Sequence, residues 1–239
     1  MAKTKLKYKR VLLKLSGEVF GGEDGAGIDG KVVRGIGKQV MELQKMGCEV
    51  GIVIGGGNIW RYRDFKHLDL GRVTSDTMGM MATCMNALAF EAILKELKVD
   101  ARAVSAFPVE KAMENYIPKR SKHHLDKGRV VIFAGGTGSP FFTTDSAAAL
   151  RALEMECDVL LKATKVDYVY DKDPMKHKDA KKYEKLSYQT IIEKGLGVMD
   201  LTCASMCKSG GLPMLVFNLE KKGAIKKAVT GAKIGTIIT

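Results

Sequence analysis

The sequence predicts an α/β protein: a three-layer sandwich with a mainly parallel central sheet and helices on both of its faces. Two observations favour this class. Apolar runs alternate along the 239-residue chain with segments whose apolar residues recur at helical spacing, which is the pattern of repeated βα units. Glycine-rich turns also follow several of the apolar runs, as in parallel sheets that bind ligands at the carboxyl ends of their strands.

Each element is expected from its local pattern. Short apolar runs predict strands at residues 10–15, 48–54, 101–106, 129–134, 158–163 and 213–218, and a short edge strand at 235–239. Segments of helical period predict helices at residues 30–47, 76–97, 144–156, 187–196, 200–211 and 223–229. The chain has no internal repeat and no low-complexity linker, so we expect a single domain. The polar stretch 164–186 is the one place where two lobes could meet.

The composition, with 46% hydrophobic and 28% charged residues, is that of an ordinary globular protein. The five cysteines form no CxxC pair, so we expect reduced thiols packed as small apolar groups rather than a metal site. No apolar run approaches the roughly 20 residues that cross a bilayer, and Lys14 interrupts the apolar segment that a signal peptide would need. We therefore expect a cytoplasmic protein with no membrane partner. The four histidines lie in polar stretches and are expected at the surface.

The net charge of +12 favours anionic partners, which are either phosphorylated substrates or nucleic acid. The lysines are spread along the chain, and their densest run, 176–185, also contains acidic residues and few aromatics. A solvated surface explains that run better than a nucleic-acid site does. A basic nucleic-acid-binding regulator remains the alternative from a different functional class.

A glycine-rich motif at residues 25–30 imitates two nucleotide-binding motifs. "GAGIDG" fits GxGxxG, but nine residues separate it from the preceding apolar run, whereas a dinucleotide-binding turn follows its strand directly. The same stretch nearly fits a P-loop, but Val32 stands where the P-loop needs Ser or Thr for Mg²⁺. We interpret this region as a surface loop that leads to a helix.

Three other turns follow predicted strands directly. In "KLSGE", Lys14 is either a strand lysine that reaches water or a cation held beside a phosphate, with Gly17 allowing close approach. In "IVIGGGNIWR", glycines 55–57 can present bare backbone N–H groups to an anion, and the Arg61 fork suits phosphate. Trp60 is interpreted as a packing residue.

The third turn lies within residues 130–153, "VVIFAGGTGSPFFTTDSAAALRAL". Thr143 and Thr144 are candidate N-caps of the following helix. Asp145 in its first turn either favours the helix dipole or aligns two lysines around a transferred group, and the sequence leaves both open. Three anion-binding turns on one sheet suit two phosphorylated substrates and a phosphoryl transfer, which requires mainly positioning and charge neutralisation.

Six motifs in order carry a resemblance to a known family: "KLSGE" (14–18), "GGGN" (55–58), "DTMGMMAT" (76–83), "GTGSPFFTTDSAA" (136–148), "LLKATKVD" (160–167) and "DKDP" (171–174). Together they resemble the bacterial uridylate kinases of the amino acid kinase superfamily, over nearly the whole chain. The resemblance implies the amino acid kinase fold and transfer of the ATP γ-phosphoryl group to UMP, giving UDP and ADP. It also implies a UMP lobe at about 1–155 and an ATP lobe at about 156–239.

The resemblance implies roles for particular residues. The ATP contacts would be Lys14, Leu15, Ser16, Gly17, Gly57, Arg61, Thr164, Tyr170 and Asp173. The UMP contacts would be Gly56, Asp76, Thr137, Gly138, Ser139, Pro140, Phe141, Phe142, Thr143 and Thr144, with Asp76 accepting hydrogen bonds from the ribose hydroxyls. The catalytic group would be Lys14, Arg61, Asp145, Lys162 and Asp200.

Regulation and assembly are also implied by the resemblance alone. We expect Mg²⁺ carried with ATP, activation by GTP, inhibition by UTP and a homohexamer. The segment that matches the GTP-responsive one is Glu23, Asp24, Gly25, Ala26, Gly27 and Ile28. Thr77, Ser139 and Tyr168 stand where the family usually has His, Asn and Gly, and Glu91 lies on a helix that often carries basic residues for GTP. A kinase of the same fold that acts on a carboxylate or carbamate is the closest alternative enzyme.

Overall fold

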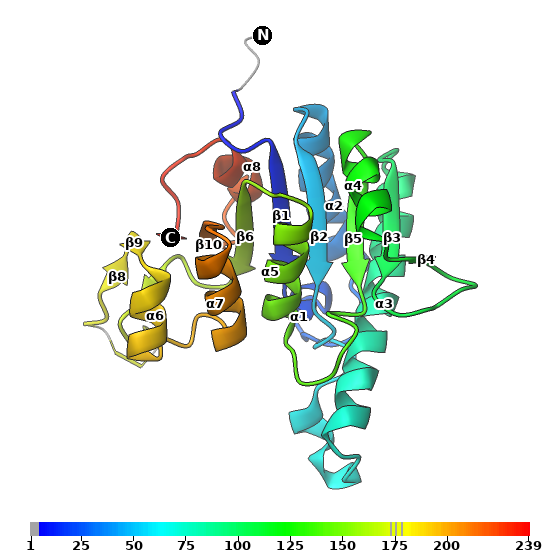
Figure 1. Cartoon of the computed structure of the whole chain (residues 1–239), viewed down its shortest axis with the longest axis horizontal. Coiled ribbons are helices and arrows are strands. Elements are labelled where there is room, and N and C mark those ends of the chain that lie inside the picture. The colour runs from blue at the N-terminus through cyan, green and yellow to red at the C-terminus, as the bar shows by residue number, and fades with distance from the viewer. Residues whose placement is uncertain (1–4, 173, 175, 178) are drawn as a thin grey trace.

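The computed structural model describes residues 5–172, 174, 176–177 and 179–239. Within them a nine-stranded sheet forms the centre of the molecule (Figure 1). Its strands, in spatial order, are β4 (Glu114–Asn115), β3 (Ala101–Ser105), β5 (Val130–Ala134), β2 (Glu49–Ile54), β1 (Arg10–Leu15), β6 (Val159–Thr164), β10 (Met214–Asn218), β11 (Thr236–Ile238) and β9 (Lys185–Leu186). All neighbours pair in parallel except β10 and β11. A separate antiparallel ladder joins β7 (Val169–Tyr170) to β8 (Lys182–Tyr183).

Helices cover both faces of the sheet, which confirms the predicted fold class (Figure 1). One face packs against α1 (Gly17–Phe20), α2 (Gly30–Lys45), α3 (Arg72–Glu96) and α8 (Ala224–Val229). The other packs against α4 (Pro118–Asp126), α5 (Thr144–Glu154), α6 (Tyr188–Lys194) and α7 (Leu201–Ser209). A 3₁₀ helix, η1 (Tyr62–Leu68), precedes α3.

The alternation of β1 explains the two cores and places Lys14. Val11, Leu13 and Leu15 belong to the core on the α2 and α3 side, whereas Leu12 belongs to the core on the α5 side. Because successive side chains of a strand point to opposite faces, Lys14 shares the face of Leu12 and points toward α5. The burial of the neighbouring apolar residues therefore fixes the direction of the one charged side chain in the middle of this strand.

Several predicted elements need correction. The terminal strand β11 is not an edge strand, because β9 pairs along its outer side. Helix α3 begins at Arg72, four residues before the predicted start. Helices α1 and α4 and the short strands β4, β7, β8 and β9 were not expected. They are short or polar; α4 has the sequence PKRSKHHLD and buries only Ser121, His124 and Leu125.

His124 also corrects the expectation that every histidine lies at the surface. It is buried on the inner side of α4, where its ring nitrogens lie 3.0 Å from Arg129 Nη1 and 3.4 Å from Glu114 Oε2. The cysteine prediction is confirmed: all five are free and buried. Burial raises the pKa of the Cys48 and Cys157 thiols to about 12, which keeps them unreactive at neutral pH.

Helix α3 is long and apolar enough, by length and composition alone, to cross a membrane. Its buried residues, including Phe90 and Leu94, instead belong to the core on one face of the sheet. A core helix of a soluble protein passes the same test of length and composition, so α3 is explained by its packing.

Candidate active site

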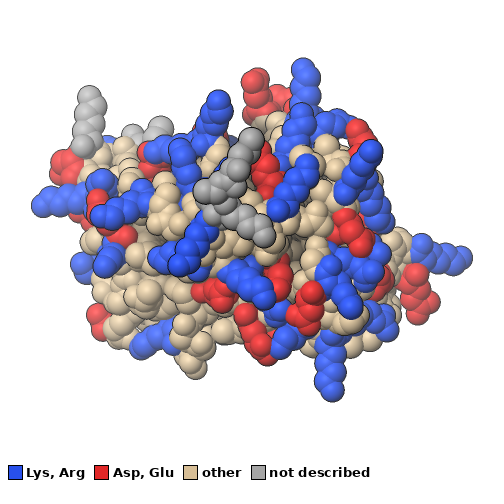
Figure 2. Space-filling view, turned by 90° about the horizontal axis from the view of Figure 1, so that it is seen from above, with Lys and Arg blue, Asp and Glu red and all other residues tan. Residues whose placement is uncertain are grey.

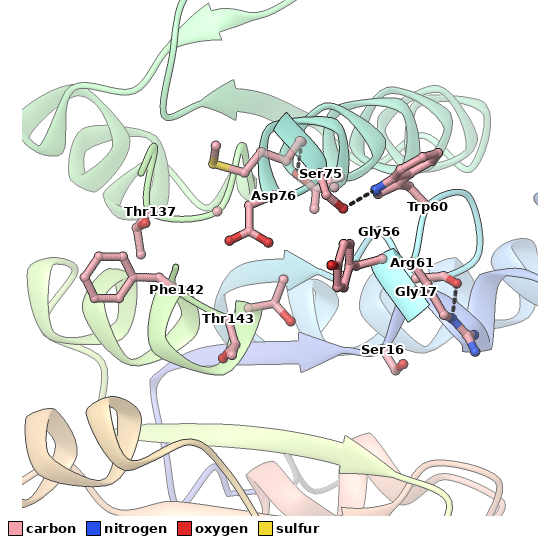
Figure 3. A pocket seen from close by; sticks show the side chains of 18 of the residues that line it. Ser16, Gly17, Gly56, Trp60, Arg61, Ser75, Asp76, Thr137, Phe142 and Thr143 are labelled. Atoms are coloured by element: carbon pink, nitrogen blue, oxygen red, sulfur yellow. Dashed lines mark hydrogen bonds between the residues drawn. The ribbon is translucent and has the colours of Figure 1, made fainter. Parts of the chain in front are cut away.

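A cavity of 720 Å³ lies beyond the carboxyl ends of β1, β2 and β5. We call its base the floor: Lys14 and the turns at 15–18 and 55–57, together with Asp145 and Lys162, an ion pair beside Lys14 that does not itself line the cavity. We call its other side the wall: the first turns of α3 and the loop 136–142. Figure 3 shows Asp76 of the wall and Arg61 beside the floor around the same space. The predicted turns after β1, β2 and β5 therefore meet at one end of the sheet, as the parallel topology requires.

Two lysines and one carboxylate form the charged centre of the floor. The parallel register of β1 and β6 places Lys14 opposite Lys162. Asp145, in the first turn of α5, lies between them: Lys14 Nζ is 2.7 Å from Asp145 Oδ1, and Lys162 Nζ donates to Asp145 Oδ2. The three side chains are only 11–15% exposed. Asp145 therefore aligns two lysines, which was one of the two roles that the sequence left open.

The pKa directions of the floor follow from burial and charge. Burial alone would raise the pKa of Asp145, but the Lys14 and Lys162 ammonium groups outweigh burial and hold that pKa below its usual value. Burial lowers the pKa of Lys162, and the charge of Asp145 opposes that shift only in part. Asp145 is thus ionised at neutral pH and a poor proton acceptor.

The 15–18 and 55–57 turns pack closely enough that only glycine fits at their contact. A Cβ atom on Gly17 would lie 2.5 Å from the Gly55 carbonyl oxygen and 2.7 Å from Gly57 N. The Leu15 side chain is fully buried in the core, so Leu15 can offer a ligand only its backbone. Ser16 and Gly17 both line the cavity.

Arg61 closes one side of the floor. Its Nη2 lies 2.9 Å from Glu18 Oε1, and its Nε donates to the Gly57 carbonyl. The guanidinium therefore bridges the two turns and still lines the cavity. A phosphate that entered here would compete with the Glu18 carboxylate for Arg61.

On the wall, Asp76 links α3 to the loop 136–142. Asp76 Oδ2 accepts from Arg72 Nε and from the Phe141 backbone N–H, both at 2.8 Å. The Arg72 guanidinium also lies 5.7 Å from the centre of the Phe141 ring. The carboxylate of Asp76 points into the cavity (Figure 3), where a hydroxyl group of a ligand could reach it.

The loop after β5 contributes most, but not all, of its predicted residues to the cavity. The predicted residues that line it are Thr137, Ser139, Phe142, Thr143 and Thr144, and Gly136, which was not predicted, lines it as well. Gly138, Pro140 and Phe141 do not line it, and the Phe141 side chain is 64% exposed. Thr143 caps α5 by accepting from the backbone N–H groups of Asp145 and Ser146, as the sequence predicted.

A second cavity, of 510 Å³, contains two of the predicted ATP contacts, Thr164 and Tyr170. Asp173, the third, lies outside the described residues. The floor connects the two cavities: Lys14 lines the first, and Lys162 Nζ donates at 2.5 Å to the carbonyl of Val198, which lines the second. Asp145 and Lys162 line neither cavity, and the three charged side chains lie between the two cavities.

Residues 9–218 match the amino acid kinase family. The chain belongs to the amino acid kinase family. Its fold is also similar to a UMP kinase from Bacillus anthracis (37% identity, 97% of this chain and 96% of that one, TM-score 0.94). A UMP kinase from Ureaplasma parvum gives 36% identity, 98% and 100% coverage and a TM-score of 0.92. A uridylate kinase from Archaeoglobus fulgidus gives 28% identity, 96% and 99% coverage and a TM-score of 0.75.

In this amino acid kinase, Asp200 lies outside the floor, at the start of α7. It caps α7 by accepting from Cys203 N at 2.8 Å, and it accepts from Ser146 Oγ at 2.7 Å and from Thr143 Oγ1. Burial would raise the pKa of Asp200, but these hydrogen bonds lower it. In the described part of the chain its hydrogen bonds thus join the starts of α5 and α7 and do not reach Lys14 or Lys162.

The segment 23–28 of this kinase lies outside the main cavity. It is an exposed loop that leads to α2, as predicted, and Asp29 caps that helix by accepting from Lys31 N and Val32 N. Glu23 lines a separate cavity of 460 Å³ together with Glu18.

Several site residues of this kinase escaped the sequence analysis. Arg72 could have been found, because it precedes Asp76 by one helical turn, but the predicted helix began too late to include it. Thr83 Oγ1 accepts from Gly135 N at 2.8 Å, across 52 residues, and no local pattern indicates that contact. Trp60, interpreted from the sequence as a packing residue, also lines the cavity and donates from Nε1 to Ser75 Oγ at 3.0 Å (Figure 3).

Proposed function

We propose that this protein is an ATP-dependent UMP kinase, which transfers the γ-phosphoryl group of ATP to UMP and releases UDP and ADP. The observation that carries the proposal is the floor, where a buried lysine and a mostly buried one share one carboxylate between two cavities. Phosphoryl transfer requires positive charge fixed around the moving group and two substrates held in line. Similarity to UMP kinases over nearly the whole chain supports UMP as the acceptor.

In the proposed reaction an oxygen of the UMP phosphate attacks the γ-phosphorus of ATP. The bond from that phosphorus to the β–γ bridging oxygen breaks, and ADP leaves with the electron pair. Lys14 and Lys162 would neutralise charge on the transferred group, and Asp145 would keep both in place. No protein base is required, because a phosphate monoester is largely ionised at neutral pH.

We assign the binding sites as follows. ATP phosphates would lie along the turns of Ser16, Gly17 and Gly57 beside Arg61, with the nucleoside part of ATP near Thr164 and Tyr170. UMP would lie against the wall, with its ribose hydroxyls donating to Asp76. The expected division into an acceptor lobe at about 1–155 and an ATP lobe at about 156–239 then applies to the two nucleoside parts, because the ATP phosphates would contact turns that lie within 1–155.

Mg²⁺ would enter with ATP. Among the described residues there is no group of three or more His, Cys, Asp or Glu side chains arranged to hold a metal ion. Mg²⁺ keeps several waters and needs only one or two protein carboxylates when a substrate supplies phosphate oxygens. The residues present suit an ion carried by the nucleotide, whose chemistry is to neutralise phosphate charge.

An acceptor panel tests this function. Purified protein is supplied with ATP and Mg²⁺, and ADP formation is measured with UMP, CMP and small carboxylate and carbamate acceptors. We expect turnover with UMP, because a cavity of 720 Å³ has the size of a nucleotide site. Turnover confined to the small acceptors would identify the related kinase instead, and absence of turnover with UMP and CMP would contradict the proposal.

The nucleic-acid alternative has less support. On the face shown in Figure 2, lysines and arginines are spread across the surface with acidic residues among them. A strongly salt-dependent affinity for DNA would revive it.

Cytoplasmic location, a homohexamer, activation by GTP through residues 23–28 and inhibition by UTP complete the proposal. Light scattering and initial rates with each effector test the last three.

A further inference from the structure

Two buried asparagines lie beneath the 55–57 turn, and the proposed reaction gives them no role. Asn86, in the middle of α3, is fully buried, and Asn58 is 6% exposed. Their side-chain amides pair reciprocally: Asn58 Nδ2 donates to Asn86 Oδ1 at 2.9 Å, and Asn86 Nδ2 donates to Asn58 Oδ1 at 2.7 Å. Unpaired, such buried amides would cost free energy, so each bond of the pair constrains the structure.

The remaining N–H of each amide points outward from the pair to a different loop. Asn86 Nδ2 donates to the Gly55 carbonyl at 2.8 Å. Asn58 Nδ2 donates to the Gly27 carbonyl at 2.6 Å, and Gly27 N donates back to the Asn58 carbonyl at 2.9 Å. Both amide groups are thus fully used, and flipping either one would set its oxygen against a backbone carbonyl.

The pair is also in contact with the other turn of the floor. A Cβ atom on Gly17 would lie 2.6 Å from Asn58 Oδ1, so the backbone of the 15–18 turn rests against this amide. Movement of Asn58 would therefore shift both turns that line the base of the cavity, together with the loop 21–29.

We propose that Asn86 is a positioning residue for the ATP phosphates: through Asn58 it sets the 55–57 turn and couples that turn to the loop 21–29. The inference rests on the proposed function only in naming ATP as the ligand of the floor. Asn86 lies behind the backbone of the turn and acts through the Gly55 carbonyl and Asn58.

Asn86→Asp tests the inference with almost no change in shape. A carboxylate at this position would set one of its oxygens against two acceptors, the Gly55 carbonyl oxygen and Asn58 Oδ1. Burial raises the pKa of such a carboxyl, and its protonated form still donates one hydrogen bond. The loss of ATP affinity in Asn86→Asp should therefore grow as the pH rises, whereas a loss caused by packing alone would not depend on pH.

The measurement uses the full chain and binding alone. Trp60 is the only tryptophan and lies next to the turn, with its backbone N–H donating to the Gly56 carbonyl. Its fluorescence therefore reports binding of ATP with Mg²⁺ in the absence of UMP. We expect the Kd for ATP to rise about tenfold, and that for UMP, whose expected contacts include only Gly56 of this turn, to rise less. Hydrogen exchange should become faster in peptides that carry Gly27 and residues 55–59.

Leu94→Ala is the matched control. Leu94 is fully buried on the same helix two turns later, and it packs toward α2. This variant should lower the Tm and leave the Kd for ATP within about twofold. If Asn86→Asp fails to fold, Asn86→Ser, whose hydroxyl keeps one donor, carries the binding and exchange measurements, without the pH dependence and with a smaller shift.

Three results would overturn the inference. The first is an unchanged Kd for ATP in a folded Asn86 variant, and the second is an equal loss of affinity for ATP and for UMP. The third is hydrogen exchange that becomes faster at residues 55–59 but stays unchanged at Gly27. Failure of the proposed function shows separately, as absence of turnover by the wild-type protein with UMP.

Discussion

The floor and the wall of the cavity differ in how firmly they are built. The floor side chains Lys14, Asp145 and Lys162 are 11–15% exposed and bound to one another. The wall exposes Phe141 by 64% and Phe142 by 49%, and Phe141 has a φ of 71°, a conformation that side-chain-bearing residues seldom adopt. The cations of the floor therefore have fixed positions before any ligand binds, whereas the wall has room to adjust.

This difference teaches where each kind of defect should appear. A charge that is already in place costs no reorganisation when the phosphoryl group moves, so changes in the floor should lower the rate. Contacts with the acceptor are made by the wall, so changes there should alter the KM for the acceptor. If changes in the floor and changes in the wall each altered both the rate and the KM for the acceptor, the two sides would not differ in function.

Removing Lys14 should have the largest effect. Because Lys14→Ala removes an ammonium group from the floor, this variant should lower kcat by about 10²- to 10³-fold, as loss of one charge-stabilising group does in other enzymes. Steady-state rates with saturating ATP and UMP measure it. Lys9→Ala, at a side chain that is 78% exposed, is the control and should behave as the wild type. An unchanged kcat in Lys14→Ala would refute the role of this lysine.

Neutralising Asp145 should lower the stability of the protein as well as the rate, because Asp145 holds both lysines of the floor. Asp145→Asn leaves the buried Lys162 and the mostly buried Lys14 without their shared partner and should lower the free energy of unfolding by about 3 kcal/mol. Because the pKa of Asp145 is lowered in the folded state, its contribution is complete well above 3.8 and is lost as the pH falls below that value. Thermal unfolding of both proteins should therefore show a Tm difference that shrinks in acid. A difference independent of pH would mean that Asp145 stabilises by packing.

Asp76→Asn tests the wall. The amide keeps an oxygen for the Phe141 N–H but loses the charge that faces Arg72 and the ribose hydroxyls. We expect the KM for UMP to rise about tenfold, the loss of one charge-assisted hydrogen bond, with the KM for ATP unchanged. Initial rates at varied UMP and varied ATP decide it. An effect on ATP alone would reverse the assignment of donor and acceptor sides.

Gly30→Ala should have the smallest effect, because Gly30 belongs to the motif that only imitates a nucleotide site. A Cβ atom there meets nothing within 4 Å, and Gly30 is the first residue of α2. We expect a gain of about 0.5 kcal/mol in unfolding free energy and unchanged kinetics. Denaturant unfolding and the kinase assay measure both. Lost activity would return this loop to the active site.

Much of the architecture was predictable from local patterns. Buried strands and amphipathic helices identify themselves by period, and each glycine turn of the cavity follows a strand directly in the sequence. Helix α4 was missed because its surface is polar, and β9 because two residues carry no period. Arg72 was missed with the first turn of α3. Asn86 was missed because its hydrogen-bond partners lie about 30 residues away in the sequence, so no local pattern indicates its role.

The sequence by itself determined the fold class and the turns that could bind phosphate, because alternation and glycine spacing depend on neighbours along the chain. Only the tertiary structure decided what the charged residues do. The register of β1 with β6 sets Lys14 opposite Lys162, and the start of α5 then places Asp145 between them. The meeting of Asn58, Asn86 and Gly27 likewise depends on the packing of three separate elements. Such contacts join residues far apart in the chain, and their energies arise from burial, which no short stretch of sequence contains.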